Sequence, residues 1–177
     1  MVHITRNIIR KYTHMQADAM IVWARDCFGC CQSWKPKVRV SFDKRRKFSY
    51  GGLYFSNLGT SPGINLAFSD EIFKDTMICY LEYEHYATDP EIGSLYFLNW
   101  KQYVDAVLCH ELAHAVQHSV ILRLKINVRS GVLQNFKGDW QDDNHGELFQ
   151  FCLRQFRREW MSDVINSSYD NKVELLT

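Results

Sequence analysis

The pattern of hydrophobic and polar positions divides the chain into helical and extended segments. Between Thr13 and Phe28, apolar residues such as Met15, Ala19 and Val22 recur at intervals of three and four, which predicts a helix. A second stretch with this period runs from about Leu95 to Ile121, and a third begins near His145. The apolar side of the third stretch is made by Phe149, Cys152, Leu153, Phe156 and Trp160.

Extended segments lie between the first two helical stretches. Lys37–Phe42 and Gly63–Phe68 alternate in polarity, and Tyr50–Phe55 is rich in glycine and aromatic residues. These patterns predict three strands, with the second pairing back on the first across a charged turn. The pattern at 71–89 is ambiguous. The predicted fold class is therefore α+β: an N-terminal helix, a small three-stranded sheet, a long helix and a C-terminal helix.

The length and composition fit one folded unit. A chain of 177 residues that is 46% hydrophobic, with 9 Gly and 3 Pro, predicts a single domain spanning 1–177 and excludes collagen-like and disordered classes. The uninterrupted apolar run Ala19–Ala24 is too short to cross a bilayer, so we expect no membrane partner. Because no secretory signal is visible at the N-terminus, we expect an intracellular location, in the cytoplasm, the nucleoid or the nucleus.

The cysteines do not form the pattern of a zinc ribbon. Cys27 and Cys30 make a single Cys-x-x-Cys pair, whereas Cys79, Cys109 and Cys152 are isolated in the sequence. A ribbon needs two such pairs. We therefore expect reduced thiols, mostly buried, and no C-terminal zinc ribbon.

The residues that point to chemistry are His110-Glu111-Leu112-Ala113-His114, inside the long predicted helix. At 3.6 residues per turn the two histidines lie on one face, one turn apart, where both can bind one Zn²⁺ ion. Glu111 projects beside them, where it can act as the general base on the water that attacks a carbonyl.

A third metal ligand must come from elsewhere in the chain. Gln117 and Val120 occupy the positions where the longer metzincin motif has glycine and histidine. His118 lies on the same helix face, but three histidines in a row along one helix cannot converge on one tetrahedral ion, so we expect it to support the ligands or lie at the surface. Downstream, His145 and Glu147 are both candidates. Their side chains should point in different directions, so the sequence pattern leaves the choice between them open.

The segment HELAHAVQH, followed later by HGELF, resembles the SprT-like (SprT/Spartan) family of zinc metallopeptidases. The upstream segments VRVSF, SYGGLYF and GINLAFSD are also similar to that family, so the resemblance covers most of residues 15–160. It implies a zincin-like fold and a zinc-dependent peptidase. It also implies His145 as the third ligand, with Glu111 as the catalytic residue. The substrates it implies are proteins, including proteins associated with DNA or crosslinked to it.

Charge is unevenly distributed along the chain. Residues 1–60 contain 11 Lys and Arg against 3 Asp and Glu, whereas the whole chain has a net charge of +1. The basic segment Lys44–Lys47, together with Lys35, Lys37 and Arg39, predicts contacts with single-stranded or damaged DNA. An alternative basic patch is formed by Arg154, Arg157 and Arg158. The alternative function is therefore a nucleic-acid-binding or adaptor module that keeps the fold and uses zinc structurally.

Overall fold

The fold is that of a computed structural model, which describes residues 4–43, 50–55, 62–74, 77–122, 126–140 and 144–165. The basic segment Lys44–Lys47 lies outside the described residues. The helices are α1 (Arg6–Phe28), α2 (Trp100–Ile121) and α3 (Glu147–Trp160), with short 3-10 helices η1 (Asp70–Phe73) and η2 (Gly131–Asn135). The strands are β1 (Lys37–Phe42), β2 (Tyr50–Phe55), β3 (Pro62–Phe68), β4 (Ile78–Tyr80) and β5 (Leu95–Leu98).

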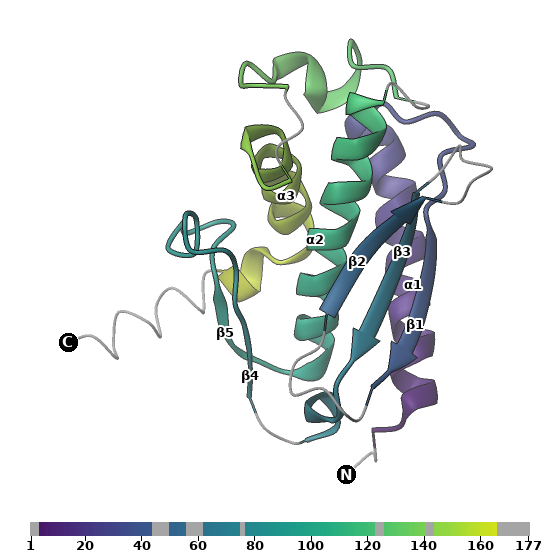
Figure 1. The fold of residues 1–177 in the computed structure, drawn as a ribbon, viewed down its shortest axis with the longest axis vertical. Helices are drawn as coiled ribbons and strands as arrows, with labels where there is room; N and C mark the ends of the chain where they lie inside the picture. The colour runs from purple at the N-terminus through teal and green to yellow at the C-terminus, as the bar shows by residue number, and fades with distance from the viewer. Residues whose placement is uncertain are drawn as a thin grey trace.

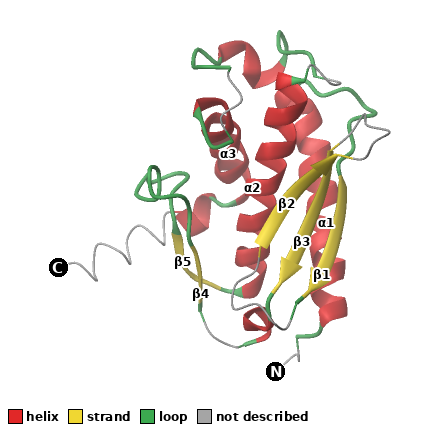
Figure 2. Cartoon of the chain, in the orientation of Figure 1, coloured by secondary structure: helices red, strands yellow, loops and turns green. Residues whose placement is uncertain are grey.

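Helix α2 lies at the centre of the molecule (Figures 1 and 2). Helices α1 and α2 cover one face of the three-stranded sheet, and α3 packs against α2 away from that sheet. Accordingly, α2 is buried around most of its circumference, from Tyr103 to Val120. The predicted α+β class is confirmed, and the packing of α3 on α2 is what positions the site described below.

The three predicted strands exist, but their order differs from the prediction. Strand β3 is central and pairs with β1 in parallel and with β2 antiparallel, so β1 and β2 do not pair with each other. The prediction that the second strand pairs back on the first is therefore wrong. The burial of β3 on both faces, except at Asn65, explains the central place of this strand in the sheet.

Helix α1 is longer than predicted, and its buried face is a different one. It begins at Arg6, after Thr5 accepts a hydrogen bond from the backbone N–H of Ile8. Met15 and Val22, from the predicted apolar stripe, are each 57% exposed. The buried face instead consists of Ile9, Thr13, Ala17, Met20, Ile21, Ala24 and Phe28. Apolar residues occur on both sides of this helix, so the period predicted the helix but not its orientation.

The long central helix begins later than predicted. Leu95–Leu98 forms strand β5, which pairs with β4 in a second, two-stranded sheet. Asn99 then ends the strand and caps the helix: its side chain accepts hydrogen bonds from the backbone N–H groups of Lys101 and Gln102, and the Gln102 side chain accepts one from the backbone of Asn99. This capping box sets the first turn of α2.

Two further expectations concern the membrane and the thiols. Within the described part of the chain, the helices lack the combination of length and apolarity that a membrane crossing requires. The six cysteines all lie among the described residues and form no disulfide. Cys30, Cys109 and Cys152 are buried as expected, whereas Cys31 and Cys79 are exposed.

Candidate metal centre

Helix α2 brings His110 and His114 together on its α3-facing side. The two residues are buried, with 7% and 9% of their surfaces exposed, and their ring centroids are 4.9 Å apart. This arrangement follows from the one-turn spacing within a regular helix. Because α3 packs against this side of α2, a residue at the start of α3 can reach the pair.

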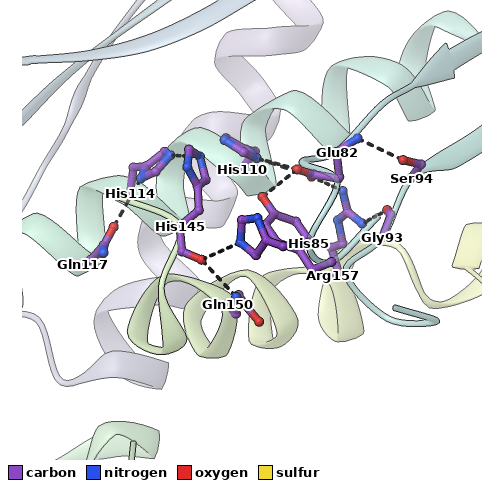
Figure 3. Close-up of polar contacts among 11 residues, drawn as sticks. Glu82, His85, Gly93, Ser94, His110, His114, Gln117, His145, Gln150 and Arg157 are labelled. Atoms are coloured by element: carbon purple, nitrogen blue, oxygen red, sulfur yellow. Dashed lines mark hydrogen bonds and ion pairs between the residues drawn. The ribbon is translucent and has the colours of Figure 1, made fainter. Parts of the chain in front are cut away.

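His145 is the residue that reaches it. This histidine lies in the turn just before α3, and its Nε2 is 3.1 Å from Nε2 of His114 (Figure 3). One ring nitrogen from each of His110, His114 and His145 lies within 4.8 Å of the others. Glu147, the other candidate, points elsewhere: its Oε2 accepts a hydrogen bond from the backbone N–H of Asp139 at 2.7 Å.

The three histidines could hold a metal ion. His110 donates from Nδ1 to the carboxylate of Glu82, and His114 donates from Nδ1 to Oε1 of Gln117. A ring that donates from Nδ1 presents Nε2 as the nitrogen available to a metal. Burial and the neighbouring histidines lower the pKa of His114 to about 3, which keeps its ring neutral. Three imidazoles are a donor set that suits zinc.

Aromatic rings pack against the imidazoles of the cluster. The fully buried ring of Phe149 lies 4.2 Å from the ring of His114 and 4.9 Å from those of His110 and His145. The ring of Tyr83, whose residue is 51% exposed, lies 3.7 Å from that of His145. His145 is also fixed through its carbonyl oxygen, which accepts a hydrogen bond from Gln150.

Glu111 follows His110 directly in α2 and has a buried carboxylate. Its residue is only 6% exposed, and its Oε2 has no hydrogen-bond partner among the described residues. Burial raises the pKa of Glu111 to about 7, with the charge of His110 opposing the shift and that of Glu82 adding to it. A carboxylate with a pKa near neutrality can both accept and return a proton.

A polar network behind His110 has no counterpart among the sequence-based expectations. The side chains of Glu82 and Arg157 are both fully buried, and Nη2 of Arg157 is 2.6 Å from Oε1 of Glu82 (Figure 3). Burial alone would raise the pKa of Glu82. The hydrogen bond from His110 and the charges of His110 and Arg157 nevertheless bring this pKa below its ordinary value. Glu82 lies in the segment whose pattern is ambiguous, so no local signal could have identified it.

Other predicted residues lie away from the cluster or are engaged elsewhere. His118 is half-buried one turn beyond His114, with 6.4 Å between the ring centroids, and is not part of the group of three. The basic patch on α3 is different from the prediction because Arg157 is buried. Its neighbours Arg154 and Arg158 form ion pairs with Asp89 and Glu91.

Comparison of the chain with models of known protein families, with curated proteins and with solved structures finds no match. The function proposed below therefore depends on the geometry of the site and on the residues of this chain.

Proposed function

We propose that this protein is a zinc-dependent metallopeptidase with a zincin-like, SprT-like fold. The observation that carries the proposal is the convergence of His110, His114 and His145, which come from two different elements, beside the buried carboxylate of Glu111. A structural zinc site has no use for such a carboxylate, because its four ligands close the coordination sphere. Proteins are the proposed substrates, including those associated with DNA or crosslinked to it.

Each residue of the site has a role in this chemistry. Zinc, when bound, supplies a Lewis acid that makes water nucleophilic near neutral pH. Glu111 accepts the proton of the attacking water and returns it to the amine of the cleaved peptide bond, which leaves as a neutral group. His110, His114 and His145 would hold the metal through ring nitrogens, and Phe149 packs against their rings.

The test of this function is the substitution Glu111→Gln. The amide has nearly the same size but cannot accept the proton, so cleavage of an unfolded test protein such as casein should fall by about 10²–10⁴-fold. Zinc content should stay near one ion per chain, because Glu111 is not a ligand. A variant that cleaves as fast as the wild type would exclude the mechanism. Loss of zinc in this variant would show instead that Glu111 has a structural role.

A second candidate function is the binding of DNA, through the exposed side of β1. Lys37 and Arg39 occupy alternate, exposed positions of β1, the exposed Lys35 lies two positions before the strand, and β1 is an edge strand of its sheet. A row of cations with a spacing of two residues can follow a phosphate backbone. In the alternative basic patch on α3, Arg157 is buried, and Arg154 and Arg158 pair with carboxylates of the chain.

We expect single-stranded DNA to bind weakly and with strong dependence on salt. Changing Lys35, Lys37 and Arg39 together to glutamine should reduce the slope of log affinity against log salt by about 0.7 for each phosphate that the variant no longer neutralises. Neutralising Lys44–Lys47 is the parallel test of the basic segment. The double change of Arg154 and Arg158 serves as the control. Absence of binding at low salt would exclude DNA as a partner and leave the peptidase proposal intact.

A further inference from the structure

Glu82 lies in the segment that joins β4 to β5, and three side chains donate hydrogen bonds to its carboxylate. His110 donates from Nδ1, with 3.2 Å to the nearer carboxylate oxygen, Tyr86 donates from its hydroxyl at 2.9 Å, and Arg157 donates at 2.6 Å (Figure 3). The backbone N–H of Glu82 also donates to Oγ of Ser94 at 3.0 Å. Both carboxylate oxygens are therefore engaged, and the group has no freedom to rotate away from His110.

Arg157 is equally constrained. Its guanidinium donates to the carbonyl oxygen of Gly93 at 2.6 Å as well as to Glu82, and its side chain is fully buried. A planar guanidinium that bridges two acceptors fixes the distance between them. Arg157 lies on α3, the helix that follows His145. Its bridge to Gly93 therefore holds the Glu82 carboxylate in contact with His110 on α2.

The two histidines of α2 differ in what their Nδ1 atoms contact. His110 meets a carboxylate, whereas His114 meets the neutral amide oxygen of Gln117. A carboxylate that accepts from Nδ1–H fixes the tautomer and orientation of the ring and makes Nε2 a better electron donor to a metal. The contact between Glu82 and His110 therefore has a consequence for metal binding that a merely structural ion pair would not have.

We propose that Glu82 is a positioning residue, which holds His110 through Nδ1 and thereby sets the metal affinity of the three-histidine site. Arg157 and Tyr86 fix the carboxylate in that orientation. This inference rests on the metal centre of the proposed function, and it adds that the affinity of the centre depends on a residue 28 positions before the nearest ligand.

The experiment measures Zn²⁺ affinity by competition with a chromophoric chelator, together with the visible absorption spectrum of the Co²⁺-loaded protein. Glu82→Gln should weaken Zn²⁺ binding by about 10- to 100-fold and shift the Co²⁺ spectrum. The matched control is Asp89→Asn. Asp89 lies in the same segment and pairs with Arg154, but its carboxylate is directed at that arginine and at backbone N–H groups, so its amide should leave both readouts unchanged.

A second variant separates positioning from loss of stability. Glu82→Gln leaves the buried charge of Arg157 without a counter-charge, so the double variant Glu82→Gln with Arg157→Met removes both charges. The proposal predicts that this double variant still binds Zn²⁺ weakly. Wild-type affinity in either the single or the folded double variant would overturn the role of Glu82 while leaving the metal centre in place. A wild-type chain that binds no metal would overturn the metal centre itself.

Discussion

Helix α2 and the segment between β4 and β5 contribute to the site in opposite ways. Helix α2 supplies His110, Glu111 and His114 within five consecutive positions, and their arrangement follows from helix geometry alone. The β4–β5 segment supplies Glu82, which meets its partners 28 and 75 residues away. The two histidines of α2 are therefore placed by local geometry, whereas Glu82 reaches His110 only once the tertiary structure has formed.

The ion pairs between the β4–β5 segment and α3 show the same contrast in energy. Arg158 is half-exposed and pairs with Glu91, an interaction that contributes about 0–1 kcal/mol at most surfaces. The pair between Arg157 and Glu82 is fully buried, and removing one partner from such a pair typically costs about 3–5 kcal/mol. The larger cost reflects the buried charge that is left uncompensated, whereas an exposed pair can be lost with little effect.

The choice of third ligand tests how far the site depends on tertiary structure. His145→Ala should lose most of the bound zinc, because two imidazoles on one helix do not complete a zinc site. Glu147→Ala should keep it, because the Glu147 carboxylate contacts Asp139 instead of the cluster. Metal analysis of the two purified variants, with circular dichroism as the check on folding, measures the difference.

The reverse outcome would show that the arrangement at the start of α3 is different in solution. If Glu147→Ala empties the site while His145→Ala does not, the third ligand is the carboxylate. If both variants keep zinc, the site is made by α2 with a ligand from elsewhere, and the packing of α3 does not determine it.

The sequence predicted the elements with a clear local period. The strands Lys37–Phe42 and Tyr50–Phe55 have the predicted bounds, and the helices containing His110 and Phe149 are present. The pairing of the strands was not predictable in this way. It depends on β3 being buried on both faces, a property set by what covers the sheet.

The sequence was least informative where burial overrides residue type. Arg157 lies four positions after Leu153 and three before Trp160, at the edge of the apolar stripe of α3, whereas Arg158 lies on the opposite side of the helix. The period therefore places Arg157 near the core, but its residue type does not predict complete burial. The structure buries Arg157 completely because Glu82 and Gly93 receive its donors. Similarly, Leu95–Leu98 is apolar enough to continue a helix, and the capping by Asn99 assigns it to a strand.

Asp105 offers a smaller test of long-range polar contacts on α2, because its carboxylate is buried against a neutral hydrogen-bond donor. The hydroxyl of Tyr12 donates to its Oδ2 at 2.8 Å, and burial raises the pKa of Asp105 from 3.8 to about 6, although this hydrogen bond and the charge of Lys101 oppose the shift. The folded state then binds the proton more tightly than the unfolded state, so the free energy of unfolding should fall as pH rises from about 4 to above 6.

Asp105→Asn removes this dependence, since the amide is neutral at every pH. The variant should match the wild type near pH 4 and exceed its free energy of unfolding by up to about 3 kcal/mol near pH 8, at 1.36 kcal/mol per pKa unit. Urea denaturation at the two pH values measures both quantities. The contrast with Glu82 follows from their partners: Arg157 compensates the buried charge of Glu82, whereas a tyrosine hydroxyl compensates Asp105 only in part. Equal stability of variant and wild type at pH 8 would show that solvent reaches this carboxylate and that its burial carries no such penalty.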